Sequence, residues 1–327
     1  MIISRTPLRM SFVGGGSDIS SFYRKYGGAV LSTAIDKYVY VSVNPKFDGG
    51  IRLAYSKVEE VSRLEDIEHQ LLRATFEMMG LSGGVEVTTT ADIPSRGTGL
   101  GSSSSFTVGL IHAAAAYLGQ QISARDLAEK SCHIEIERCC EPIGKQDQYA
   151  AAFGGLNLIE FHEDDSVNVS PVIVPRGYCE NLQKRLIVFY TGITRSASAI
   201  LKTQTEVSGT DMKKQAALRR MVELAYVLRD EMGSGELDSF GEILHENWEL
   251  KKSLTSGIST PDIDAWYESA RDAGALGGKL LGAGSGGFMM FYAPEDRHVE
   301  IESAIGLRRV DVKFDPLGSR ILFYQPS

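Results

Sequence analysis

The chain has 327 residues, of which 43% are hydrophobic and 23% charged, and this length predicts two domains that each have a core of their own. The formal net charge of −8 argues against a nucleic-acid partner, because proteins that bind a phosphate backbone need a basic face. No hydrophobic run reaches membrane-spanning length and no signal peptide precedes the strand-like Ile2 and Ile3, so we expect a cytoplasmic protein without a membrane partner.

The first predicted element is an alternating strand that carries Arg9 and runs into three consecutive glycines at residues 14–16. Asp18 follows near the start of the next element. Its carboxylate could bond to a ligand, or it could cap the helix that comes after it. Two further strands are expected over residues 39–43 and 85–89.

A glycine- and serine-rich segment at residues 94–105 is followed by an apolar, alanine-rich helix over 106–118. The alternating glycines free backbone N–H groups to point at one spot, and the helix adds unpaired N–H groups and the positive end of its dipole. A flexible linker is the alternative, but linkers are not normally closed by such a helix. A Walker loop is excluded because no lysine follows Gly101 in the segment. We expect nucleotide phosphate to bind here, at Gly97, Gly99, Leu100, Gly101, Ser102, Ser103 and Ser104.

A second helix is predicted from Ser123, where a Ser-x-x-Asp pattern resembles a capping box, to about Cys140. It carries Glu135 and Glu137, which lie roughly 200° apart around the helix axis and cannot both face one ligand. A glycine-led polar loop then places Asp147 beside an alanine-rich segment. That pattern is hard to explain as core, although a simple Asx turn is the alternative.

The second half begins near residues 177–184, a plausible crossing point between a domain at 1–180 and a domain at 181–327. A strand over 186–190 leads to a glycine-bearing turn with Arg195, a place suited to phosphate. Strands and helices mix without regular βαβ repetition, which predicts an α+β fold. The remaining elements expected are helices over 216–232 and 237–254, a helix from Pro261, and strands around 310–312 and 321–323.

A second glycine cluster contains Gly282, Gly284 and Gly287 and fits the G-x-G-x-x-G pattern of dinucleotide-binding proteins. The apolar run 288–292 behind it predicts a buried strand, whereas the dinucleotide-binding fingerprint needs a helix at that point. A Rossmann interpretation is therefore rejected.

Together, the segments 5–18, 94–105 and 279–288 resemble the three motifs of the GHMP small-molecule kinases, named for galactokinase, homoserine kinase, mevalonate kinase and phosphomevalonate kinase. The motifs come in the family's order and span nearly the whole chain. The resemblance implies an N-terminal domain like ribosomal protein S5 domain 2, a ferredoxin-like C-terminal domain, and an active site between them that uses ATP and Mg²⁺. It also implies small-molecule partners, a sugar phosphate and a nucleotide.

In the family, an aspartate at the position of Asp147 contacts the acceptor hydroxyl, either to remove its proton or to orient it, and Arg9 is its expected partner. The guanidinium would also stabilise the migrating phosphoryl group. By the same carry-over the magnesium ligands are Ser103 and Glu137. Glu137 is preferred to Glu135 because its distance from Asp147 fits the family better. The substrate would contact Asp18, Gly15, Gly16, Arg195, Gly284 and Ser285.

Within the family, the chain most resembles the sugar 1-kinases that act on heptose 7-phosphate. Galactokinases carry Glu-His where this chain has Gly15 and Gly16, and the glycines leave space for a larger sugar with a terminal phosphate. Arg195, or less well Arg5, would bind that phosphate, although surface arginine is the ordinary role of either residue. Transfer to the anomeric hydroxyl of heptose 7-phosphate is therefore expected. A fucose or galactose 1-kinase is the alternative within the family, and a sugar and nucleotide sensor is the alternative without turnover.

Overall fold

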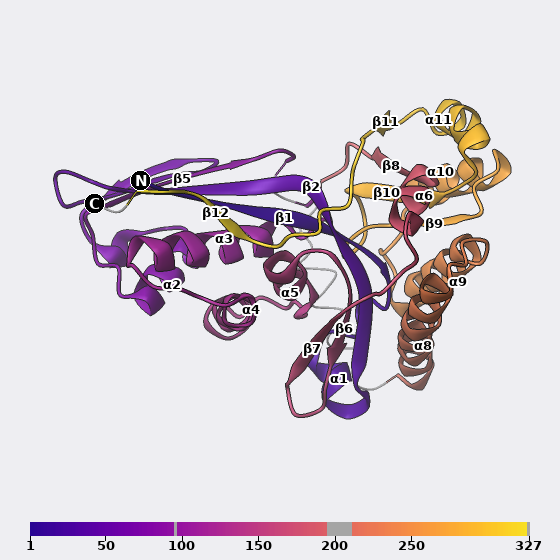
Figure 1. Ribbon diagram of the computed structural model, residues 1–327, viewed down its shortest axis with the longest axis horizontal. Helices are drawn as coiled ribbons and strands as arrows, with labels where there is room; N and C mark the ends of the chain where they lie inside the picture. The colour runs from indigo at the N-terminus through magenta and orange to yellow at the C-terminus, as the bar shows by residue number, and fades with distance from the viewer. Residues whose placement is uncertain (95–96, 195–210, 326–327) are drawn as a thin grey trace.

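The computed structural model describes residues 1–94, 97–194 and 211–325. Two long antiparallel strands, β1 (Ile2–Val13) and β2 (Gly28–Pro45), form the centre of the first sheet (Figure 1). The sheet order is β12-β1-β2-β5-β3-β4, and β6 and β7 branch from β2, because β2 pairs with β6 near its start and with β5 near its end. The remaining strands are β3 (Ile51–Ala54), β4 (Val58–Val61), β5 (Val85–Ala91), β6 (Leu156–Phe161), β7 (Val167–Pro171) and β12 (Arg320–Tyr324).

Helices α2 (Gln70–Met79), α3 (Ser102–Tyr117), α4 (Ala124–Cys132) and α5 (Gln146–Phe153) cover one face of this sheet (Figure 1). The central one, α3, is apolar on nearly all sides because it contacts both long strands and the other three helices. The capping prediction at Ser123 is confirmed, since its side chain accepts a hydrogen bond from the Asp126 N–H at 3.1 Å. After α4 the chain continues as a π-helix over His133–Arg138.

The second sheet is antiparallel throughout and has the order β11-β8-β10-β9. In chain order this is 4-1-3-2, the order of a ferredoxin-like domain, with helices between the first and second strands and between the third and fourth. The strands are β8 (Leu186–Tyr190), β9 (Gly277–Leu280), β10 (Phe288–Tyr292) and β11 (Arg308–Arg309). The helices are α8 (Met212–Ser234), α9 (Phe240–Leu254), α10 (Pro261–Asp272) and α11 (His298–Ile305). Short helices α1 (Ser20–Tyr26) and α6 (Tyr178–Lys184) follow β1 and precede β8.

The α+β prediction is confirmed, and so is the strand behind the second glycine cluster, which is β10. The strand expected around 310–312 lies slightly earlier, because β11 pairs with β8 through residues 308 and 309 and the Val310 N–H extends this contact by donating to the Val188 carbonyl at 2.8 Å. The strand expected at 321–323 exists as β12. It pairs with β1 and belongs to the first sheet, although its residues fall within the predicted domain at 181–327. No helix within the described ranges is long and apolar enough to cross a bilayer.

Candidate active site

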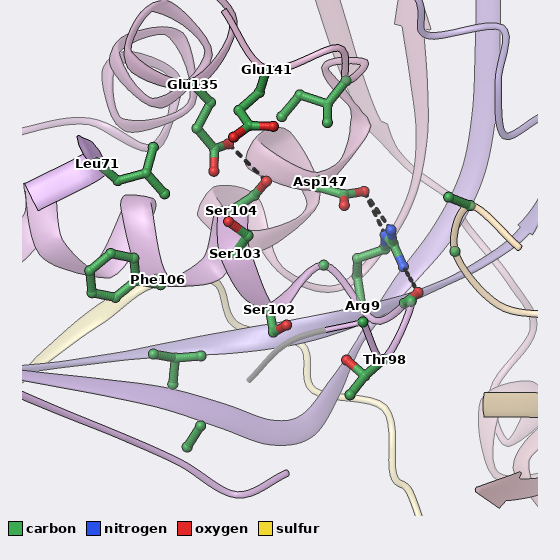
Figure 2. Close-up of a pocket in the computed structure, with 18 of the residues that line it drawn as sticks. Arg9, Leu71, Thr98, Ser102, Ser103, Ser104, Phe106, Glu135, Glu141 and Asp147 are labelled. Atoms are coloured by element: carbon green, nitrogen blue, oxygen red, sulfur yellow. Dashed lines mark hydrogen bonds and ion pairs between the residues drawn. The ribbon is translucent and has the colours of Figure 1, made fainter. Parts of the chain in front are cut away.

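A cavity of about 1060 Å³ lies where the first sheet, its helices and the second half of the chain meet. Its walls come from β1, the loop before α3, the N-terminus of α5, helix α9 and the loop after β9. Figure 2 shows part of this cavity, with Arg9, Asp147 and Glu135 around it. Segments far apart in the sequence therefore meet at one site.

The loop before α3 has the geometry of an anion cradle. Gly97, Gly99 and Gly101 have φ of +67°, +75° and +75°, a left-handed conformation that side chains rarely adopt. Gly101 is the N-cap of α3 and has no side chain to bond to the first N–H groups of the helix. The cavity is lined here by all three glycines, Thr98, Ser102, Ser103 and Ser104. Leu100 is an exception, because its side chain is buried in the core and its carbonyl accepts a hydrogen bond from the Arg9 N–H at 3.1 Å.

Arg9 and Asp147 form an ion pair at the cavity (Figure 2). The Asp147 Oδ1 atom accepts a hydrogen bond from Arg9 Nε at 2.8 Å and lies 2.6 Å from Arg9 Nη2. The third guanidinium nitrogen donates to the Gly99 carbonyl at 2.7 Å. Arg9 is only 3% exposed, so strand β1 fixes it beneath the phosphate loop and beside the first turn of α5. The guanidinium can hold the carboxylate and contact an anion on the loop at the same time.

Asp18 connects the glycines at residues 14–16, called here the first glycine loop, to the start of α5, which carries Asp147. Its carboxylate accepts hydrogen bonds from the Gly16 N–H at 2.9 Å and from the Gln146 N–H at 3.2 Å. Burial and the nearby charge of Asp147 raise the pKa of Asp18. Gly144 makes this contact possible, because a Cβ there would lie 1.9 Å from Asp18 Oδ2. The N-cap of α1 is Ile19 and shows no side-chain capping bond, so Asp18 does not cap this helix, and its role as a substrate ligand stays a prediction.

Glu135 faces the serine side of the cavity, and Glu137 does not. The Glu135 carboxylate is 1% exposed and accepts hydrogen bonds from Ser104 Oγ at 2.8 Å, Thr107 Oγ1 at 2.9 Å and the Gln148 amide. Burial is the main cause that raises its pKa to about 7. The Glu137 side chain is 69% exposed and pairs with His133 at 2.8 Å. Glu137 therefore faces away from the cavity, because packing turns the Glu135 side of the helix toward α3, and Glu135 is the one of the two that lines the cavity.

Two other predicted substrate residues are also placed elsewhere. Gly284 packs against Ile258, and a Cβ there would lie 2.8 Å from the Ile258 Cα. Ser285 donates its hydroxyl to the Gly257 carbonyl and its N–H to the Ile258 carbonyl, so both residues shape the loop and do not line the cavity. Gly15 and Gly16 do line it. Arg195 lies outside the described residues.

Comparisons with known proteins decide the family. The model of the GHMP kinases N terminal domain matches residues 67–155, and that of the GHMP kinases C terminal domain matches residues 224–307. The chain belongs to the GHMP kinases. It is 31% identical over 319 residues to D-glycero-alpha-D-manno-heptose 7-phosphate kinase of Campylobacter jejuni, with 93% of each chain covered.

Other relatives agree with this family. The chain is 27% identical to the bifunctional fucokinase/GDP-fucose pyrophosphorylase of Arabidopsis thaliana, with 88% of this chain and 29% of that protein covered. The crystal structure of a D-glycero-D-manno-heptose 1-phosphate kinase from Bacteroides thetaiotaomicron superposes with a TM-score of 0.81 at 27% identity and covers 99% of both chains. The expectation of a GHMP kinase fold is confirmed.

GHMP kinases use ATP, and the anion cradle of this kinase suits the phosphates of ATP. The oxygen donors beside the cradle also fit Mg²⁺, because Ser103, with its hydroxyl, and Glu135, with its carboxylate, both line the cavity. In the ranges that the structure describes, no three His, Cys, Asp or Glu side chains form a metal cluster. A magnesium ion here would therefore take its other ligands from phosphate oxygens and water.

Several residues of this kinase site carried no signal in the sequence. Lys251 lines the cavity from the last turn of α9, but it stands beside Lys252 on an amphipathic helix, a pattern typical of a solvated face. One end of the cavity is lined by the aromatic rings of Tyr55, His69 and Phe106. The ring centroids of Tyr55 and Phe106 lie 4.7 and 5.5 Å from that of His69. These rings come from three distant segments, so only the tertiary fold brings them together.

Proposed function

We propose that this kinase transfers the terminal phosphoryl group of Mg-ATP to the anomeric C1 hydroxyl of D-glycero-D-manno-heptose 7-phosphate. The product would be the 1,7-bisphosphate, which serves the synthesis of a nucleotide-activated heptose for surface polysaccharide. The observation that carries the proposal is the Arg9 and Asp147 pair, set in one cavity between the anion cradle and Asp18. The heptose phosphate kinases among the relatives support the choice of sugar.

The cavity contains a candidate group for each requirement of phosphoryl transfer. The backbone of the cradle and the N-terminus of α3 would hold the ATP phosphates. Asp147 would accept a hydrogen bond from the C1 hydroxyl and can take its proton, and Arg9 would stabilise the charge of the group in transit. Ser103 and Glu135 would hold Mg²⁺, whose charge neutralises the outer phosphates.

The acceptor side of the cavity is formed by the first glycine loop. Gly15 and Gly16 present no side chains to it, and a Cβ at Gly15 would come no nearer than 3.7 Å to its neighbours. Asp18 would bond to sugar hydroxyls from the end of the same loop. Arg195 stays the proposed contact for the distant phosphate. Arg5 is less suited, because it lies over the Tyr38 ring at 4.2 Å and near Asp315 at 4.0 Å.

A fucose or galactose 1-kinase is the second candidate, because relatives named fucokinase and galactokinase match most of the chain. The sensor hypothesis has less support. A binding protein without turnover would be expected to have lost part of the catalytic set, yet Asp147, Arg9, Ser103 and a buried glutamate are all present at the cavity.

The test is ADP release with Mg-ATP across heptose 7-phosphate, heptose, fucose, galactose and mannose, with the position of the new phosphate found by phosphorus NMR. We expect turnover confined to heptose 7-phosphate and a new anomeric phosphate. Efficient turnover of a free sugar would keep the kinase and reject the terminal-phosphate site. Binding of sugar and nucleotide without any turnover would favour the sensor.

A further inference from the structure

Lys251 is a buried lysine that reaches the catalytic cavity from the second half of the chain. It is 6% exposed, belongs to the last turn of α9 and lines the cavity together with Arg9 and Asp147. Its ammonium group donates to the carbonyl of Gly282, which also lines the cavity. A lysine is rarely buried without a reason, because removal of its charge from water is costly.

The face of α9 that carries Lys251 lies against the first glycine loop. Asn247, Lys251 and Leu254 are four and three residues apart, a spacing that puts them on one side of a helix. The Asn247 Oδ1 atom accepts a hydrogen bond from the Gly14 N–H at 3.1 Å. A Cβ at Gly16 would lie 4.0 Å from a Leu254 methyl carbon. Lys251 therefore sits between two contacts to the loop that forms the acceptor side.

Lys251 and Arg9 approach one junction from opposite halves of the chain. Arg9 donates to the Gly99 carbonyl at 2.7 Å, and Lys251 donates to the Gly282 carbonyl. These two glycines meet backbone to backbone, because a Cβ on Gly282 would lie 2.2 Å from the Gly99 Cα. Arg9 and Lys251 therefore bond to the two sides of one backbone contact, between the anion cradle and the loop after β9.

The ammonium group of Lys251 is under-satisfied. An ammonium has three N–H donors, and within the described residues its hydrogen bonding is to the Gly282 carbonyl, with no carboxylate in ion-pair contact. Burial, and then the charge of Arg9, lower its pKa to about 8, while Asp18 and Asp147 act in the opposite direction. Lys279 is a contrast, because it donates to two carbonyls at 2.9 Å and does not line the cavity. Lys251 thus keeps donors for an anion that enters the cavity.

We propose that Lys251 is a second cationic contact for the phosphoryl group in transit, opposite Arg9. The inference rests on the proposed phosphoryl transfer but not on the identity of the sugar. In that step the bond from the terminal phosphorus to ADP breaks, a bond to the acceptor oxygen forms, and the hydroxyl proton leaves to Asp147. Lys251 keeps its own protons and donates hydrogen bonds to the non-bridging phosphoryl oxygens. A donor of this kind acts mainly on the transition state.

The test compares Lys251→Met, which keeps the apolar stem, with Lys251→Arg and with the control Lys252→Met. Lys252 is the next residue on the same helix, is partly exposed and pairs with Glu249 at 2.8 Å. We expect Lys251→Met to lower kcat about 100-fold or more and to weaken binding of ATP by a smaller factor, with KM for the acceptor little changed, and Lys251→Arg to recover part of the loss. The control should stay near wild type.

Binding measurements without any sugar separate this proposal from the proposed substrate. With Mg²⁺ present, Lys251→Met should bind ADP like wild type but bind the non-hydrolysable ATP analogue AMPPNP more weakly, because only AMPPNP carries the terminal phosphate. Kinetics are measured with whichever acceptor the wild type uses best. A rise in acceptor KM with kcat intact would overturn the proposal, and so would parallel loss of melting temperature, ADP binding and AMPPNP binding, or wild-type behaviour throughout.

Discussion

Asp147→Asn is the most direct perturbation of the catalytic pair, because it removes one charge and almost no volume. Asp147 receives two close contacts from Arg9, at 2.8 and 2.6 Å. The amide oxygen can keep both hydrogen bonds, which stay charge-assisted because Arg9 remains ionised, but the buried guanidinium loses its counter-charge. Breaking a fully buried ion pair costs about 3–5 kcal/mol, and the loss of stability should be smaller here because the Asp147 side chain is 24% exposed to screening solvent.

The catalytic loss is measured on the folded variant and is separate from the loss of stability. Removal of a group that accepts the acceptor proton costs on the order of 10²- to 10⁴-fold in rate. We expect kcat to fall by that factor in a coupled ADP-release assay, while calorimetric affinity for Mg-ADP stays near wild type. Asp126→Asn, a change of the same type at an exposed helix N-terminus, is the control. Turnover of Asp147→Asn within about 3-fold of wild type would refute the role assigned to this carboxylate.

Three further changes test the site and its supports. Burial raises the pKa of Glu135 from 4.5 to about 7, so the metal-free wild type loses stability as pH rises through 7. The free energy of unfolding of Glu135→Gln, measured by urea unfolding in EDTA, should therefore exceed that of wild type by up to about 3 kcal/mol at pH 8 and by little at pH 5. Gly144→Ala would put a Cβ 1.9 Å from Asp18 Oδ2, where ordinary contact starts at 3.4 Å. The displaced carboxylate should raise the KM for the acceptor about 10-fold or more and leave nucleotide affinity unchanged. An acceptor KM equal to that of wild type would contradict the acceptor role of Asp18. Gly284→Ala, at φ +132°, should destabilise the fold by about 1–3 kcal/mol, while the folded enzyme keeps its kcat/KM. The control is Gly233→Ala in helix α8, where the new Cβ would lie 3.5 Å from the Ile173 carbonyl oxygen and the melting temperature should not fall.

Local chemistry made the phosphate loop predictable from the sequence. Alternating glycines in a left-handed conformation and a helix that follows at once are properties of neighbouring residues, and the structure has both at Gly97, Gly99 and Gly101. The rejection of a Rossmann loop was correct for the same reason, because β10 begins directly after Gly287. Patterns between neighbouring residues can be predicted because they do not depend on distant tertiary contacts.

The sequence did not predict which face of a helix would be buried against the rest of the protein. Glu135 and Glu137 belong to one helical segment, and only its packing against α3 decides which of them reaches the cavity. Lys251 resembles its partly exposed neighbour Lys252 in sequence, but it is buried and bonds to the Gly282 carbonyl, 31 positions further along the chain. In both cases the deciding contact comes from residues more than twenty positions away, beyond the reach of any helical periodicity.

The pairing of β12 with β1 has a consequence for how the enzyme folds. Ile2 is aligned with Tyr324, and the Met1 amino group donates to the Gln325 carbonyl at 2.8 Å. The strand that carries Arg9 therefore keeps one edge open until a segment more than three hundred residues later has been made. Contacts of such separation form slowly, and an open strand edge invites pairing with other chains. A fragment that stops before Arg320 is expected to self-associate through β1, even though it would contain Arg9, Asp147 and the whole anion cradle.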